Sequence, residues 1–231
     1  FHKPPRVILH LCNIIIYFEI PYNVFHSFIF GFMINIFKRK RSVYEEIAVL
    51  CKDGFEEIEA LTPVDVLRRA NVHVDLVGMD DLKVTSSHQI TIQMDCVFND
   101  QIKEYDGIVI PGGLPGATNL RDDARVIEIV QQFNQEHKLI AAICAGPIVL
   151  AKAGILKDKI CTCSPGFETQ LTGANYQEAI VQKDDHIITG KGPAAALEFG
   201  YTILESLGYD SSNLRQGMQY EYLMNVEAHK E

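Results

Sequence analysis

Short apolar runs alternate with amphipathic stretches from about residue 46 to residue 207. The runs that predict buried or half-buried strands are Glu46–Cys51, Val72–Gly78, Tyr105–Pro111, Leu139–Ile143, 160–163 and 186–189. Lys83–Cys96 holds β-prone residues and is expected to form a hairpin or an edge strand. Helical spacing of apolar residues predicts helices over Glu56–Ala70, Asp123–His137, Gly146–Ala153 and Pro193–Leu207.

This order of strands and helices defines the expected fold class. It predicts an α/β domain with a doubly wound, mostly parallel sheet and helices on both faces. No internal repeat or linker divides residues 42–231, so we expect them to form a single domain. Ligands of such sheets bind beyond the carboxyl ends of the strands. The residues that follow those ends are Glu56, Glu57 and Glu59, then Gly112 and Gly113, and then Cys144.

Residues 1–41 differ from the rest of the chain in composition and charge. They hold six Lys/Arg and one Glu, whereas residues 42–231 are strongly acidic. Val7 to Phe37 has the basic flank of a membrane anchor, but polar residues interrupt the span and no signal-peptide cleavage site follows. The chain starts with Phe1, and its first Met is Met33. We interpret 1–41 as a disordered extension or a start site set too early; an anchor or a packed addition to the fold is the alternative.

Charge and cysteine content narrow the classes of function. The net charge of −9 at pH 7 argues against specific nucleic-acid binding. Six cysteines in an α/β chain of 231 residues favour reduced thiols, and therefore a cytoplasmic protein, over a disulfide framework. Cys161 and Cys163 have no second Cys pair or nearby His cluster, so we predict no metal site. Neither G-x-x-x-x-G-K nor G-x-G-x-x-G occurs, so no nucleotide cofactor is expected.

Cys144 is the strongest candidate for a reactive side chain. It lies between a predicted strand and a predicted helix that opens with Ala145, Gly146 and Pro147. A thiol near a helix N-terminus is favoured in its ionised form. The small residues around it also allow the sharp turn of a nucleophile elbow. The alternative is a buried and inert cysteine, because free cysteines are often buried.

Two further features are expected beside Cys144. Gly112 and Gly113 follow a buried strand, and backbone N–H groups there can form an oxyanion hole with the N–H of Ala145; the alternative is a tight turn. Glu59 lies in the first turns of a helix, and a carboxyl group close to a thiol can accept or share its proton. The alternative for Glu59 is an exposed acid that matches the helix dipole.

The order of several motifs resembles that of the ThiJ/PfpI superfamily. These motifs are Glu56-Glu-Ile-Glu59, Pro63-Val-Asp-Val-Leu-Arg-Arg69, Pro111-Gly-Gly113, Ala141-Ala-Ile-Cys-Ala-Gly-Pro147 and Gly192-Pro193. The similarity covers roughly 45–207 and is greatest to the glyoxalase and deglycase branch. It implies a flavodoxin-like fold and a homodimer. It also implies roles for four residues: Cys144 as the nucleophile, Glu59 as its hydrogen-bond partner, and Gly113 and Ala145 as backbone oxyanion donors.

The chain departs from that pattern at two places. Ser164 stands where many relatives carry a His after the cysteine, so we expect no Cys-His-acid triad and no peptidase or glutaminase activity. Ser87-His88-Gln89 stands where the branch often has an Arg at the pocket, so His88 is a candidate pocket residue. Gly192 and Pro193 are candidates for a pocket wall, or else only begin the last long helix.

The resemblance implies chemistry on small carbonyl compounds without a cofactor. The first hypothesis is a glyoxalase and deglycase that acts on methylglyoxal, glyoxal and early glycation adducts of proteins or nucleotides. The second is a non-enzymatic oxidative-stress sensor or redox-regulated chaperone that uses oxidation of Cys144. A third class, a binding module for a small metabolite, has no feature in the sequence that names its ligand.

Overall fold

The computed structural model describes residues 6–11, 14–19 and 45–225. The chain separates into two units, Phe1–Val43 and Tyr44–Glu231. In the first unit, β1 (Arg6–Leu11) pairs antiparallel with β2 (Ile14–Glu19). The other residues of 1–41 lie outside the described part of the chain, so our interpretation of this segment stays a prediction.

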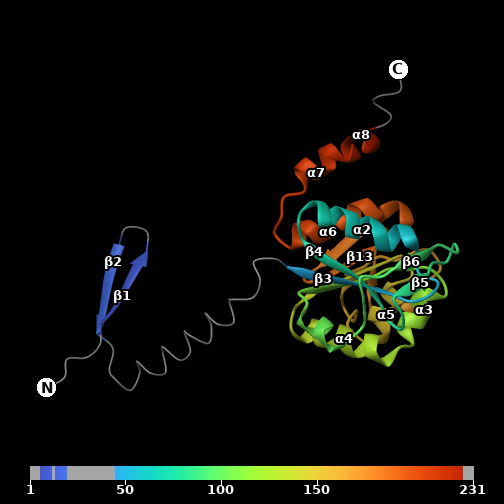
Figure 1. The fold of residues 1–231 in the computed structure, drawn as a ribbon, viewed down its shortest axis with the longest axis horizontal. Coiled ribbons are helices and arrows are strands. Elements are labelled where there is room, and N and C mark those ends of the chain that lie inside the picture. The colour runs from blue at the N-terminus through green and yellow to red at the C-terminus, as the bar shows by residue number, and fades with distance from the viewer. Residues whose placement is uncertain (1–5, 12–13, 20–44, 226–231) are drawn as a thin grey trace. The chain divides into compact units, whose positions relative to one another are not determined.

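The second unit is built on a seven-stranded sheet (Figure 1). The strand order is β12-β13-β9-β8-β3-β4-β7, and neighbouring strands are parallel except for β12 and β13. The strands are β3 (Glu46–Cys51), β4 (His73–Gly78), β7 (Cys96–Val97), β8 (Gly107–Ile110), β9 (Leu139–Ile143), β12 (Val181–Asp184) and β13 (Ile187–Gly190). The predicted doubly wound, mostly parallel sheet is confirmed.

Helices cover both faces of this sheet (Figure 1). One face carries α2 (Glu57–Arg69) and α6 (Ala196–Ser206), and the other carries α3 (Gly116–Arg121), α4 (Ala124–Gln135) and α5 (Pro147–Lys152). The chain continues into α7 (Ser212–Gly217) and α8 (Tyr220–Met224), and short 3₁₀ turns occupy Asp100–Glu104, Glu168–Gln170 and Pro193–Ala195. None of the helices in the described residues has the length and apolar character needed to cross a bilayer.

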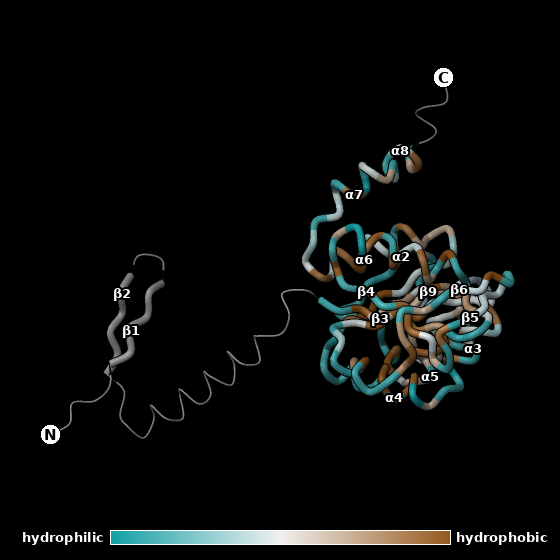
Figure 2. The backbone as a smooth tube through the Cα atoms, viewed as in Figure 1, coloured by the Kyte–Doolittle hydropathy of each residue, from teal (hydrophilic) through white to brown (hydrophobic). Residues whose placement is uncertain are grey.

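Two hydrophobic clusters form the core, one on each side of the sheet. Along β3, Ile47 and Val49 pack with α2 and α6, whereas Ala48 and Leu50 pack with α4 and α5. Figure 2 shows the result as hydrophobic stretches along the central strands and hydrophilic stretches in the outer turns. Because both faces of the central strands are buried, their sequences are almost uninterrupted apolar runs, which is why the runs predicted strands.

The structure differs from the predicted elements in several places, and it decides between the alternatives left open for Lys83–Cys96. The segment 160–163 is not a strand of the main sheet, because β10 covers only Ile160–Cys161 and pairs with β11 (Asn175–Tyr176). Lys83–Cys96 forms both alternatives: β5 (Lys83–Thr85) and β6 (Thr91–Gln93) make a hairpin, and β7 is an edge strand. The short helix α3 was not predicted, because Gly, Thr and Asn within it are weak helix formers.

Candidate active site

Cys144 lies at a sharp turn between β9 and α5. Its backbone is left-handed, with φ of 62°, which costs a residue with a side chain about 1–3 kcal/mol. Two backbone hydrogen bonds hold the turn: the N–H of Cys144 donates to the carbonyl of Gly190, and its carbonyl accepts from the N–H of Ser164, both at 2.9 Å. The side chain is only partly buried, unlike those of Cys161 and Cys163. This is the geometry expected of a nucleophile elbow.

Glu59 is fully buried beside this thiol. Its Oε2 accepts a hydrogen bond from the N–H of Gly112 at 2.8 Å. Its Oε1 has no hydrogen-bond partner of normal geometry among the described residues, although Cys144 lies close enough to affect its titration. Burial raises the pKa of Glu59 to about 7, while the nearby thiol of Cys144 and the hydrogen bond from Gly112 oppose the rise. The carboxyl group therefore gains and loses a proton near neutral pH, as a general acid or base requires.

The glycine pair after β8 is needed for this close approach. A Cβ atom on Gly112 would lie 2.6 Å from Glu59 Oε2 and 2.7 Å from the Cβ of Cys144. Gly113 has φ of 83°, and a Cβ there would lie 2.4 Å from the backbone nitrogen of Glu56. The N–H of Gly112 is occupied by Glu59, whereas those of Gly113 and Ala145 donate to no carbonyl of the described residues. The N–H of Gly113 is therefore available to a developing oxyanion, and the N–H of Ala145 faces the Cys144 sulfur, where such an oxyanion would form.

The pKa of Cys144 is raised, whereas a thiol at a helix N-terminus was predicted to favour its ionised form. Burial and the charge of Glu59 raise the pKa of Cys144 to about 11, although hydrogen bonds from the Ser164 hydroxyl and the Ala145 N–H lower it. The helix that follows, α5, has only six residues, so its dipole is weak. The thiol is therefore protonated at neutral pH and needs a base for activation.

Ser164 is a site residue whose contact with the thiol was not predicted. The sequence showed it only as a departure from a His in the relatives, and that position was the available signal. Its N–H donates to the Cys144 carbonyl at 2.9 Å, and its hydroxyl lies near enough to the thiol to lower the pKa of Cys144. A hydroxyl donor favours the thiolate but, unlike a His, does not act as a strong base. Ser164 can therefore support an ionised Cys144 without completing a triad.

Substitution of Ser164 by alanine is expected to raise the pKa of Cys144 further. A hydrogen bond to a charged group contributes about 1.5–3 kcal/mol, so alkylation of Cys144 by iodoacetamide at pH 8 should slow by about tenfold or more. Peptide mass spectrometry over a time course measures the rate at this one thiol. Ser164→Thr keeps the hydroxyl and should keep the rate. Equal rates in wild type and Ser164→Ala would show that the hydroxyl does not support the thiolate.

The remaining predicted pocket residues lie farther from the thiol. Nδ1 of His88 is 3.0 Å from Glu57 Oε1 and 3.5 Å from Glu56 Oε2, at the start of α2. Pro193 begins the 3₁₀ turn that leads into α6, and a Cβ on Gly192 would meet nothing within 4 Å. None of the contacts among the described residues joins His88, Gly192 or Pro193 to Cys144, so their role in a pocket stays a prediction.

A cysteine on a strained turn at the carboxyl edge of a parallel sheet, with a buried acid beside it, marks a flavodoxin-like protein with a candidate nucleophile. The family model described as the DJ-1/PfpI family matches residues 45–206. The chain belongs to this family, which confirms the resemblance seen in its motifs.

Curated relatives and solved structures agree with this assignment. The chain is 39% identical over 165 residues to the Parkinson disease protein 7 homolog of Danio rerio, covering 69% of this chain and 87% of the relative. It is 35% identical over 164 residues to the protein dj-1beta of Drosophila melanogaster, covering the same shares. The crystal structure of Drosophila melanogaster DJ-1beta has a TM-score of 0.73 at 32% identity, covering 76% of this chain and 98% of that one. The structure of oxidized Toxoplasma gondii DJ-1 has a TM-score of 0.70 at 31% identity, covering 78% of this chain and 98% of that one.

Proposed function

We propose that this protein is a cofactor-independent glyoxalase and deglycase that acts on reactive carbonyl compounds through Cys144. Its substrates are methylglyoxal, glyoxal and early glycation adducts of proteins or nucleotides. One observation carries the proposal: Glu59, with a pKa of about 7, has an unbonded oxygen beside a thiol with a pKa of about 11. At neutral pH the thiol is protonated and part of the carboxyl group is ionised. The carboxylate can therefore take the thiol proton as the sulfur adds to an aldehyde.

The proposed reaction begins with addition of Cys144 Sγ to the aldehyde carbon of methylglyoxal. Glu59 accepts the thiol proton as the S–C bond forms, and the carbonyl oxygen gains the electron pair of its π bond. The N–H groups of Gly113 and Ala145 stabilise that oxygen, which then takes up a proton to give a hemithioacetal. Hydrogen transfer from the former aldehyde carbon to the neighbouring ketone carbon, with Glu59 relaying protons, leaves a thioester. Water cleaves the thioester to lactate and the free thiol, so substrate and water account for all atoms of the product.

The dependence of turnover on pH tests the role of Glu59 as the base. Because the carboxylate must be ionised to accept the proton, kcat/KM for methylglyoxal should rise with pH to a plateau, with an apparent pKa of about 7 for the pair. In Glu59→Gln the rate should be low and lack this inflection. An inflection that persists near pH 7 in Glu59→Gln would assign the base to another group.

A redox role for the same cysteine is the second candidate function. Cys144 is partly exposed, and the Ser164 hydroxyl and Ala145 N–H can hydrogen-bond to oxygens added to its sulfur. A protonated Glu59 can donate to the same group. Oxidation to the sulfinic acid would then report oxidant exposure or regulate a chaperone activity. The name of the Toxoplasma gondii structure describes that protein as oxidized.

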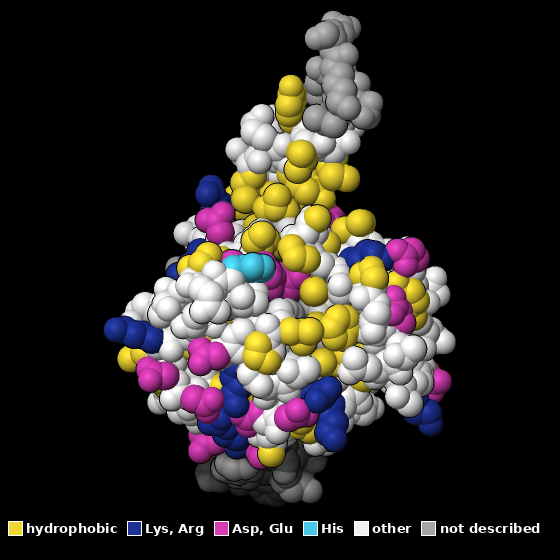
Figure 3. Space-filling view, turned by 90° about the vertical axis from the view of Figure 1, so that its right-hand side faces the viewer, with side chains coloured by type: hydrophobic (Ala, Val, Ile, Leu, Met, Phe, Trp, Pro, Cys, Tyr) yellow, Lys and Arg dark blue, Asp and Glu magenta, His cyan; other side chains and the backbone are white. Residues whose placement is uncertain are grey.

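We also propose that the protein acts as a homodimer in the cytoplasm. Ile58 of α2 and Ile90 of the β5–β6 hairpin are each 50% exposed. Separately, Figure 3 shows apolar side chains gathered on one face of the molecule. Exposed apolar surface of this kind favours association with a second copy. The five cysteines of the described residues are all free, which supports a reducing compartment. Gel filtration with light scattering measures the oligomeric state.

A further inference from the structure

A second cluster of polar side chains lies at the amino-terminal edge of the sheet. His137 precedes β9, and Asp185 and His186 form the turn that joins β12 to β13. Cys144 follows the carboxyl end of β9, whose five residues span roughly 17 Å. The cluster is therefore too far from Cys144 to take part in the proposed reaction.

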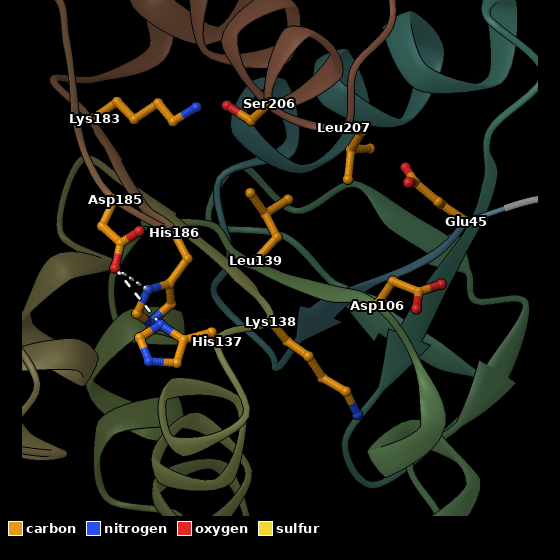
Figure 4. A pocket seen from close by; sticks show the side chains of 10 residues that line it. All are labelled: Glu45, Asp106, His137, Lys138, Leu139, Lys183, Asp185, His186, Ser206 and Leu207. Atoms are coloured by element: carbon orange, nitrogen blue, oxygen red, sulfur yellow. Dashed lines mark hydrogen bonds and ion pairs between the residues drawn. The ribbon is translucent and has the colours of Figure 1, made fainter. Parts of the chain in front are cut away.

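The three side chains converge on a small volume. Asp185 Oδ2 lies 3.0 Å from Nδ1 of His186 and 3.6 Å from Nδ1 of His137. One ligand atom from each of the three residues lies within 4.8 Å of the others. A tetrahedral zinc ion with bonds of about 2.1 Å holds its ligand atoms roughly 3.4 Å apart, so small side-chain movements suffice to bind one. Figure 4 shows Asp185 joined to both rings at one end of a pocket.

Asn134 of α4 supplies an independent observation that points to a cation. Its Oδ1 lies 3.0 Å from Nε2 of His186, where it can accept a hydrogen bond from a protonated Nε2 and so leave Nδ1 for a metal ion. Nδ1 of His186 and Oδ2 of Asp185 face each other at 3.0 Å, on the side of the ring away from Asn134. Histidine ligands of metal ions commonly donate their other ring N–H to such an acceptor. His186 is also the least exposed of the three, with 10% of its side chain accessible.

We propose that His137, Asp185 and His186 bind a divalent transition-metal ion of the Zn²⁺ type. Two imidazole nitrogens and one carboxylate oxygen match the ligand preference of such an ion. The adjoining pocket, of about 400 Å³ and open to solvent, leaves room for water or an anion as the fourth ligand. The bound ion ties the turn after α4 to the β12–β13 hairpin. It acts as a site separate from Cys144.

Three lysines lie near the cluster: Lys183 lines the same pocket, and the other two have partners of their own. Lys138 is turned away from the cluster, with Nζ 2.6 Å from the carbonyl of Lys103 and 2.8 Å from Glu136. Lys159 pairs with Asp184 at 3.0 Å. The alternative to a bound metal ion is a simple ion pair between His186 and Asp185, which would not involve His137. Nδ1 of His137 lies 3.6 Å from the same oxygen of Asp185, which is beyond a normal hydrogen bond but close to the separation of two ligand atoms on one tetrahedral ion.

Titration of the full chain with Zn²⁺ and Co²⁺ tests the proposal. The protein is made without a polyhistidine tag and is freed of metal with a chelator. Calorimetry then measures the affinity and the stoichiometry of metal binding. The absorption spectrum of bound Co²⁺ reports the type of ligand. One ion should bind with a tetrahedral Co²⁺ spectrum that lacks a thiolate charge-transfer band. His137→Ala and His186→Ala should each weaken binding by at least about 100-fold, and Asn134→Ala by about 10–100-fold.

Matched variants make the outcomes decisive. His73 is a surface histidine paired with a single carboxylate, Asp75, so His73→Ala should bind Zn²⁺ as wild type does. His137 is 73% exposed, so His137→Ala should fold even if His186→Ala does not. Unchanged affinity in His137→Ala, or a Co²⁺ spectrum with thiolate character, would overturn the proposal and leave only an ion pair between His186 and Asp185. Methylglyoxal turnover is expected to be the same in His137→Ala and wild type, because the cluster lies far from Cys144.

Discussion

Replacement of Cys144 by alanine is expected to lower kcat/KM for methylglyoxal by on the order of 10³-fold or more, to near the uncatalysed rate. The thiol forms the bond to the aldehyde, so Glu59 and the two N–H donors have nothing to activate or stabilise once it is absent. Alanine removes one sulfur from a partly buried position, so the fold should persist. Lactate formation measured beside a thermal unfolding curve separates lost chemistry from lost structure.

Cys96→Ala is the matched control for this substitution. Cys96 is also a partly buried free cysteine, but it lies in the edge strand β7, and its variant should keep the wild-type rate. Turnover by Cys144→Ala at the wild-type rate would refute the proposed mechanism. Mild peroxide distinguishes the second candidate: if Cys144 selectively gains two oxygens while wild-type turnover stays at background, the protein is a redox sensor and not a glyoxalase.

Substitution of Glu59 by glutamine is expected to abolish a loss of about 3 kcal/mol in the free energy of unfolding that wild type shows as pH rises from 4.5 to 7. The carboxyl group ionises near its ordinary pKa of 4.5 when unfolded and at about 7 when folded. Between these pH values the folded state holds more protons, so the free energy of unfolding falls as pH rises, and the loss is complete above pH 7. Glutamine does not titrate. The variant should therefore gain stability relative to wild type from pH 4 to pH 8, as measured by urea unfolding.

Glu57→Gln is a control with the opposite sign. Burial alone would raise the pKa of Glu57, but hydrogen bonds from the backbone N–H of Glu57 and from His88 lower this pKa overall. Its contribution to stability is therefore present above pH 4.5 and is lost as pH falls through the folded pKa. Relative to wild type, Glu57→Gln should lose stability as pH rises. If Glu59→Gln follows the same direction as Glu57→Gln, burial does not raise the pKa of Glu59.

Strand and helix positions were predicted best where the tertiary structure buries both sides of an element. The bounds of β3 and β9 agree with the predicted runs, because each strand contributes apolar side chains to both core clusters. The prediction was wrong for 160–163, where only two residues form a strand outside the main sheet. Short elements of this kind depend on contacts with distant residues more than on their own pattern.

The sequence by itself determined the fold class, the family and the position of Cys144 at a strand-to-helix turn, because these follow from periodicity and from motif order. Only the tertiary structure decided how the site titrates. The pKa values of Cys144 and Glu59 depend on loss of water and on short distances between residues far apart in the chain. The contact of Ser164 with the thiol and the approach of His137 to His186 have the same origin. The residues of each pair are far apart in the chain and meet only in the tertiary fold, and a local pattern does not encode their distance.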